Sequence, residues 1–241
     1  MGMRSIVSRR SLLVLAASLL PAQLAAQQQP DTRPGVAVLP FAQGVSIGAS
    51  REDLGALGIG LQEILITELA LNPAMRVVDR SVIRKLMEEQ ELSASGRVDA
   101  ATAARMGKIV GAKYVFTGGF NDLDGQFHLD ARIVDVETTE VIKAQRVTDR
   151  RERLYPIVVE MAQRLTRDVN LPSLEAPVRE ERETRGATIP RDAVILYSQA
   201  QYFQDRGQVD RAKELYRRIT KDFPAMTEAQ EALRRIEPTG A

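Results

Sequence analysis

Residues 113–135 have the sequence KYVFTGGFNDLDGQFHLDARIVD and predict a β-hairpin. Residues 113–120 are strand-like, and Asp124-Gly125 is a tight-turn signal. From Phe127 to Ile133, apolar side chains then alternate with polar ones such as His128. Because successive side chains of a strand point to opposite faces, this alternation indicates a hairpin with one buried face and one wet face.

Upstream of the hairpin, short apolar runs alternate with helical patterns. The run GVAVLPF at 35–41 is typical of a strand buried on both faces, and 75–78 predicts a second short strand. Leucine and isoleucine recur at helical spacing over 57–69. Asp79 and Asp99 are expected to cap two further helices, of which the second stops at Gly111.

Downstream, residues 141–147 predict another strand, and Pro156 suits the first turn of a helix that ends near Val169. We therefore expect an α/β domain over residues 35–170. Residues 171–190 contain three prolines and a run of charges with few large apolar residues, so they predict a flexible linker. Residues 191–237 predict a small all-α domain in which two helices pack about a turn at Gly207 and a third follows.

The N-terminus has the order of a secretory signal peptide. Three arginines precede the apolar run 12–20, and small residues lead to Ala26. We expect cleavage near Ala26, which makes residues 1–26 a removable leader and places the mature chain in the periplasm. Arg9-Arg10 leaves open whether export uses the general or the twin-arginine route. The mature chain has no apolar stretch approaching 18 residues, so any membrane contact is expected to be peripheral.

Composition argues against several classes of function. Without the three leader arginines, 30 of the 33 basic residues remain against 32 acidic ones, which gives nucleic-acid binding no support. The sequence has no cysteine and one histidine, so a thiol nucleophile and a multi-histidine metal site are excluded. We expect no cofactor, no metal, no small-molecule substrate and no enzymatic activity, although carboxylates brought together by folding stay open.

Two local motifs allow a functional interpretation beside a structural one. Gly55, Gly58 and Gly60 invite comparison with a phosphate-binding loop, but their order fits neither nucleotide fingerprint, so close helix packing is favoured. Asp122 and Asp124 resemble the start of a calcium loop, but the later acidic ligands are missing and a hairpin turn is favoured.

The segment from Val36 to about Leu165 resembles the CsgG family of curli production assembly and transport components. The similarity rests on short words in the family's order: AVLPF at 37–41, RVVDR at 76–80, GAKY at 111–114 and ARIVD at 131–135. It implies an anticodon-binding-like α/β sandwich of mixed sheet and helices, shared with periplasmic proteins that activate penicillin-binding proteins or belong to Tol assemblies.

Two departures from this family matter. Its secretion channels resemble lipoproteins, whereas this chain has no cysteine to acylate, so we expect no lipid anchor. Thr139 stands in a turn where the family usually has glycine. Because a left-handed conformation costs a β-branched residue about 1 kcal/mol or more, this hairpin is expected to turn differently.

The C-terminal piece resembles a tetratricopeptide (TPR-like) repeat, with Ala200, Phe203, Gly207, Ala212, Tyr216 and Pro224 at that repeat's spacing. Such arrays need about three repeats for stability. A single repeat is therefore expected to dock on the first domain or to pair between subunits.

These features favour a protein-interaction or assembly factor of the periplasm, and they leave association with the outer membrane open. A subunit of a curli-type secretion channel and a periplasmic activator of cell-wall synthases are the alternatives. Candidate partner-binding residues are Arg80, for which a structural role is favoured, and Phe203 and Tyr216, for which core packing is the default. The expected partners are other envelope proteins or a second copy of the chain.

Overall fold

A computed structural model describes residues 31–47, 54–90 and 98–237. The expected leader, residues 1–26, lies outside this range. All helices and strands reported below belong to one compact unit that begins at Arg33.

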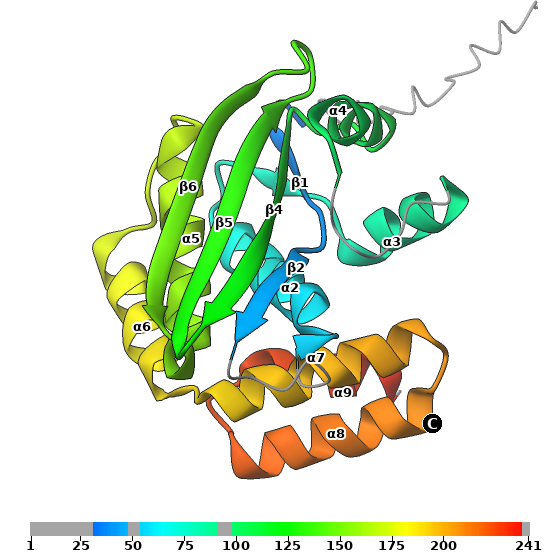
Figure 1. The fold of residues 1–241 in the computed structure, drawn as a ribbon, viewed down its shortest axis with the longest axis vertical. Coiled ribbons are helices and arrows are strands. Elements are labelled where there is room, and N and C mark those ends of the chain that lie inside the picture. Colours follow the sequence, from blue (N-terminus) through cyan, green and yellow to red (C-terminus); the bar gives the residue numbers. More distant parts are fainter. Residues whose placement is uncertain (1–30, 48–53, 91–97, 238–241) are drawn as a thin grey trace, which may run out of the picture. The chain divides into compact units, whose positions relative to one another are not determined.

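A mixed sheet forms the centre of this unit (Figure 1). Its strands are β1 (Gly35–Val38), β2 (Ala42–Ile47), β3 (Arg76–Val77), β4 (Tyr114–Leu123), β5 (Gln126–Asp135) and β6 (Val141–Arg150). The order is β3-β1-β4-β5-β6, and β2 also pairs with β4. The pairs β1–β3, β1–β4 and β2–β4 are parallel, whereas β4–β5 and β5–β6 are antiparallel. The hairpin predicted over residues 113–135 is therefore confirmed as β4–β5.

The helices described are α2 (Leu57–Ala70), α3 (Arg80–Glu89), α4 (Ala100–Ile109), α5 (Leu154–Asp168), α6 (Ala176–Thr188), α7 (Arg191–Asp205), α8 (Val209–Asp222) and α9 (Thr227–Ile236). A short 3₁₀ helix, η1 (Arg151–Arg153), precedes α5. Asp79 caps α3 by accepting the Ser81 N–H at 2.7 Å, and Asp99 caps α4 by accepting the Thr102 N–H at the same distance. Both predicted caps are confirmed. None of the described helices is both long and apolar enough to span a bilayer.

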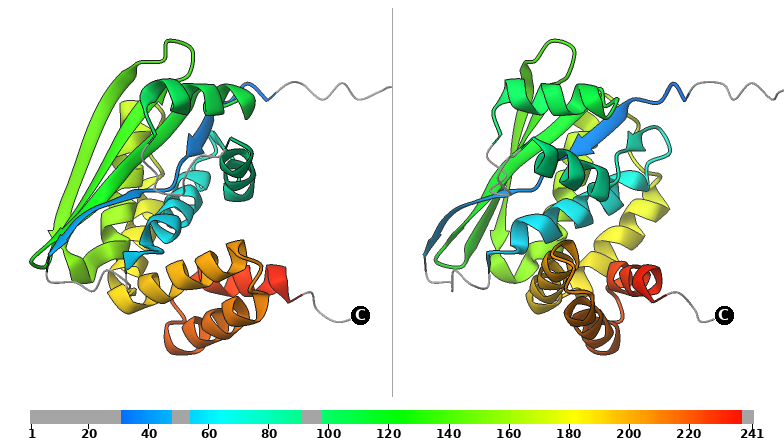
Figure 2. Two further views of the ribbon diagram at one scale, coloured as in Figure 1. Left: turned by 45° about the vertical axis from the view of Figure 1, so that its right-hand side comes forward. Right: turned by 90° about the vertical axis from the view of Figure 1, so that its right-hand side faces the viewer.

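The two faces of the sheet are covered unequally. One face packs against α2 and α5 through a large core that includes Phe116, Phe120, Leu129, Leu61 and Ile157. The other face packs against α3 and α4 through a smaller core around Val115 and Val134. Figure 2 shows α3 and α4 gathered at one end of the strands, so the fold is an α/β sandwich with one face covered only in part.

The segment that the sequence predicts as a linker contains helix α6. Gly186 of α6 is buried against Tyr155, and Ile189 joins the large core. Arg182 and Arg185 of this helix reach into the molecule and bind Glu68 and Glu228. Composition suggested disorder because the segment has few apolar residues. Buried ion pairs, rather than apolar contacts, hold this helix against the rest of the molecule.

The C-terminal helices share the large core with the sheet. Tyr197 of α7 and Tyr216 of α8 lie in the same apolar cluster as Leu61 of α2. A Cβ atom on Gly60 of α2 would lie 1.8 Å from the Ser198 Oγ atom, so α2 and α7 approach closely at a glycine. Likewise, a Cβ atom on Gly58 would lie 2.0 Å from the carbonyl oxygen of Phe41. These contacts favour the packing interpretation of Gly58 and Gly60.

The two turns of the antiparallel strands differ in strain. Asp124 and Gly125 both have positive φ, 49° and 86°, as a tight two-residue hairpin turn requires. Thr139 also has a positive φ, 64°, so the expectation that this turn avoids the left-handed conformation is wrong. The carboxylate of Asp135 accepts the N–H groups of Glu137 and Thr138, at 2.9 and 3.0 Å. These hydrogen bonds hold the turn despite its strained threonine.

Candidate interaction surface

The sheet leaves one polar surface without a covering helix among the described elements, and we call it the open face. It consists of three rows across β4, β5 and β6, set by strand register: Thr117, Arg132 and Ala144; Gly119, Asp130 and Arg146; Asn121, His128 and Thr148. The row partners share a face because opposite residues of paired strands point the same way. The intervening residues of β5, such as Leu129 and Ile133, are buried in the large core. The wet face predicted from the alternation of β5 is this open face.

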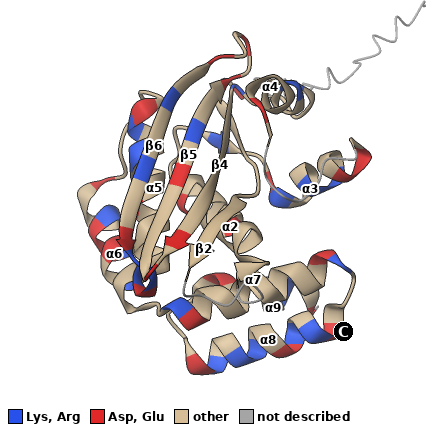
Figure 3. Ribbon diagram, in the orientation of Figure 1, with Lys and Arg blue, Asp and Glu red and all other residues tan. Residues whose placement is uncertain are grey.

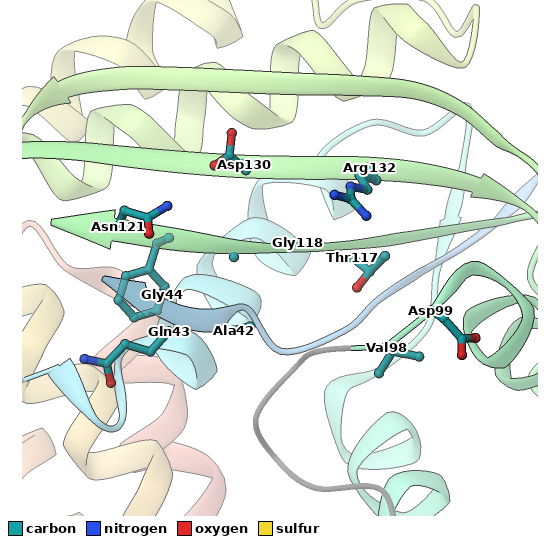
Figure 4. A pocket seen from close by; sticks show the side chains of 12 residues that line it. Ala42, Gln43, Gly44, Val98, Asp99, Thr117, Gly118, Asn121, Asp130 and Arg132 are labelled. Atoms are coloured by element: carbon teal, nitrogen blue, oxygen red, sulfur yellow. The ribbon is translucent and has the colours of Figure 1, made fainter. Parts of the chain in front are cut away.

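A groove runs along the open face between β5, β2 and the start of α4 (Figure 4). Its volume is about 480 Å³, within the range of sites that hold small molecules or short peptide segments. Residues that line it include Gln43, Asp99, Thr117, Asn121, Asp130 and Arg132. The groove exists because Gly119 places no side chain between Thr117 and Asn121 on this face of β4.

The charged groups of the open face are partly paired. Asp130 accepts two hydrogen bonds from Arg146, at 2.6 and 3.1 Å, and this interaction raises the pKa of the Arg146 guanidinium. Asp99 accepts the backbone N–H of Thr102, which lowers the pKa of its carboxyl group. His128 shares a hydrogen bond with the Thr148 hydroxyl at 2.8 Å. Figure 3 shows acidic and basic positions interspersed along β5 and β6. Both carboxylates are thus engaged, and neither is poised as a general base.

Arg80, a candidate partner-binding residue, lies inside the molecule. Its side chain is 10% exposed and joins three helices, since it contacts Asp205 of α7 at 2.6 Å and Glu63 of α2 at 3.2 Å. It also donates to the Gln201 side chain at 2.5 Å. Burial raises the pKa of Glu63 although Arg80 opposes that effect. Through these contacts Arg80 joins helices inside the molecule, which is the kind of structural role that the sequence favours.

The two aromatic candidates belong to the packing of the C-terminal helices. Tyr216 is fully buried, and its ring centroid lies 6.0 Å from that of Tyr197. Phe203 is partly buried, with the Arg211 guanidinium 5.5 Å from its ring centroid. Neither residue lies on the open face, so the structure does not bring the three candidates together with the groove.

Sequence reasoning missed a buried ionic cluster between α2, α5, α6 and α9. Glu68 and Glu228, both under 5% exposed, contact Arg182 and Arg185. The Tyr155 hydroxyl lies within hydrogen-bond distance of both carboxylates, at 2.8 and 2.7 Å, and its single proton is donated to one of them. Burial and the two nearby carboxylates raise the pKa of Tyr155, so it stays a neutral donor. These residues are far apart in sequence, and no local pattern marks them.

The sequence does contain one local signal of the groove. Glycines within a strand weaken it unless a close approach requires them. A Cβ atom on Gly118 would lie 1.9 Å from the Asp130 carbonyl oxygen, and one on Gly119 would lie 2.7 Å from that of Ala42. The pair Gly118-Gly119 in a predicted strand was therefore the available signal. Within the described part of the chain, no group of three acidic, histidine or cysteine residues is placed to hold a metal ion.

Comparison with known proteins was made for sequence and structure. Residues 18–127 match the model of the family described as "Curli production assembly/transport component CsgG". No curated protein matches the sequence significantly.

Among solved structures, the LpoB C-terminal domain from Escherichia coli is 18% identical, over 48% of this chain and 82% of its own, with a TM-score of 0.39. TolB from Acinetobacter baumannii is 15% identical, over 58% of this chain and 29% of its own, with a TM-score of 0.40. The PelC dodecamer from Paraburkholderia phytofirmans is 12% identical, over 58% of this chain and 90% of its own, with a TM-score of 0.33. At these scores the likenesses carry no inference about function.

The family match covers α2, α3, α4, β1 to β4 and the turn into β5, the same core that the words AVLPF, RVVDR and GAKY indicated. The chain therefore carries a CsgG-like domain.

Proposed function

We propose that the protein is a non-enzymatic interaction or assembly factor of the cell envelope that acts in the periplasm and holds a partner protein on its open face. The observation that carries this proposal is the uncovered half of the sheet with its polar groove (Figure 4). Strand β5 buries Phe127, Leu129, Ala131 and Ile133 on its other face, so its polar side chains on the open face are the ones available for contact. The match to a family of assembly and transport components supports the same role.

The state of the polar groups in the groove supports binding over catalysis. Asp99 caps a helix, and Asp130 is held by Arg146. A general base needs a lone pair within reach of a substrate proton, and a nucleophile needs a base beside it. Among the described residues that line the groove, Thr117 carries the only hydroxyl, and its partner on β5 is Arg132 rather than a base.

The burial of β5 favours this role over that of a secretion-channel subunit. A channel subunit would have to place strands with alternating apolar residues in the outer membrane, and β5 has that alternation. Its apolar side chains Phe127, Leu129 and Ile133 are at most 1% exposed and belong to the large core. Inserting them into lipid requires taking that core apart.

Photocrosslinking in cells tests the proposal. A photoreactive amino acid placed at Thr148, exposed on the open face, should join the protein to a defined envelope protein. The same group at Glu181, exposed on α6, should not. If Thr148 yields only uncrosslinked monomer, the open face is not an interaction surface. The identity of the captured protein decides whether the partner is a cell-wall synthase.

A further inference from the structure

We propose that the groove binds an acidic segment of a partner protein in extended conformation, with a partner carboxylate on the guanidinium of Arg132. This inference deepens the proposed function, on which it rests, by naming the chemistry of the partner.

Arg132 is exposed on β5, the central strand of the open face, in one row with Thr117 and Ala144. It has no ion pair with any residue that the structure describes. By contrast, Arg146 in the next row binds Asp130 through two nitrogen atoms. A guanidinium presents a planar fork of donors that matches a carboxylate, so Arg132 has a recognition surface that its own sheet does not use.

The floor of the groove gives a partner chain room to lie close to the sheet. Gly119 leaves backbone exposed between Thr117 and Asn121, and Figure 4 shows Thr117, Asn121 and Arg132 around this space. The side-chain oxygen of Asn121 accepts the N–H of Val45 at 2.9 Å, so its amide nitrogen is left as a donor. A backbone carbonyl of the bound segment is the matching acceptor.

The open face is locally basic on a chain that is nearly neutral. Arg132 and Arg146 lie on it with one acid, Asp130, which Arg146 already pairs, and Arg150 continues the same side of the sheet one row beyond, opposite Gln126. Asp99 stands at the α4 end of the groove, where it caps that helix. The whole chain has a formal net charge of +1, so attraction for an acidic ligand arises from this face rather than from overall charge.

The shape of the surface favours an extended chain over a compact ligand. The polar rows repeat at every second residue of β4, β5 and β6, and no described helix interrupts them. An extended segment presents its own side chains with the same period of two. Its acidic side chains can thus reach Arg132 and Arg150 while its backbone lies over Gly119.

Titration of the full mature chain with a fluorescein-labelled octapeptide of alternating Glu and Thr tests the inference. We expect saturable binding, weaker at high salt, and no binding of the matched peptide of alternating Gln and Thr. Amide chemical shifts should change along β4 and β5. Arg132→Gln should weaken binding about tenfold, as expected for a charged pair of about 1.4 kcal/mol. Arg167→Gln, which removes an exposed arginine of α5 on the covered side of the sheet, should leave the affinity unchanged.

Three results would overturn the inference: equal binding of both peptides, shift changes confined to α7–α9, or an unchanged affinity of the Arg132→Gln variant. Crosslinking from Thr148 keeps this test separate from that of the proposed function. If Thr148 captures the envelope protein with unchanged yield in the Arg132→Gln variant, the interaction role stands and the acidic-segment inference fails. Capture of a second copy of this chain also overturns it, because the occupant is then not a partner protein.

Discussion

Thr139 is the one β-branched residue that the structure holds at positive φ within the described ranges, at 64°. Replacing it with glycine removes the clash of Cβ with the backbone but adds freedom to the unfolded chain. We expect Thr139→Gly to raise the free energy of unfolding by about 0.5 to 1 kcal/mol, measured by urea denaturation. Thr138→Gly is the matched control. The φ of Thr138 is not positive, so this substitution should not raise the free energy of unfolding. An increase equal to that of Thr139→Gly would show that turn strain is not the cause.

Glu228 gives the stability of the protein a dependence on pH. Burial raises the pKa of its carboxyl group, but hydrogen bonds and charge from Arg185 and the Tyr155 hydroxyl outweigh this and lower the pKa below 4.5. A lowered carboxyl pKa stabilises the folded state above the unfolded pKa, and this contribution is lost as the pH falls through the folded pKa. Glu228→Gln should therefore lower the free energy of unfolding by about 3 kcal/mol at pH 7, and by less at pH 3.

The measurement is urea denaturation of both proteins at pH 7 and pH 3. Glu231→Gln on the same helix is the control. Glu231 is exposed and lies 3.7 Å from Arg235, so its loss should cost less than about 0.5 kcal/mol at either pH. A constant deficit of the Glu228 variant across the pH range would contradict the assigned ionisation.

At the scale of elements, the contact of α2 with α7 depends on a single missing methyl group. An alanine Cβ at position 60 would lie 1.8 Å from the Ser198 Oγ atom and 3.0 Å from the Ser198 Cα atom. Overpacking of this kind costs about 1–3 kcal/mol, which exceeds the gain of up to about 1 kcal/mol in helix propensity. We expect Gly60→Ala to destabilise the protein and the double variant Gly60→Ala, Ser198→Gly to recover part of the loss.

A double-mutant cycle from thermal unfolding measures this coupling. The Ser198 hydroxyl donates to the Val194 carbonyl oxygen of its own helix, so its removal breaks no hydrogen bond between α2 and α7. If the effects of the two single substitutions simply add, the helices do not meet at these residues.

The elements that the sequence predicted well are those with local signals. Asp79 and Asp99 cap their helices, and Asp124-Gly125 forms the hairpin turn. Strand β2 was missed, because AQGVSI has no apolar alternation and pairs with β4 through backbone groups. Helix α6 was missed because its order comes from buried pairs such as Arg182 with Glu68, which lie 114 residues apart. The polarity of the open face followed from the alternation in β5, but the groove depends on where α4 and β2 begin.

At the scale of the whole molecule, the C-terminal helices and the sheet are joined by one core and by two ionic clusters. Arg80 links α3 to Asp205 of α7, while Arg182 and Arg185 link α6 to Glu68 of α2. The sequence alone predicts a domain that ends near Asn170 and a separate helical piece after a linker. The shared core instead predicts that the two parts unfold together, because separating them exposes Leu61, Tyr155 and Ile157.

Hydrogen exchange of the mature chain, followed by mass spectrometry in increasing urea, measures this directly. Amides of α8 and of β4 should reach the same opening free energy, since both then exchange through global unfolding. A chain that ends at residue 170 should lose its cooperative transition, whereas a chain that lacks only residues 238–241 should keep it. If the chain that ends at residue 170 unfolds with the midpoint of the full protein, the sheet is an independent domain. The buried charges between the parts would then be a docking contact rather than part of one core.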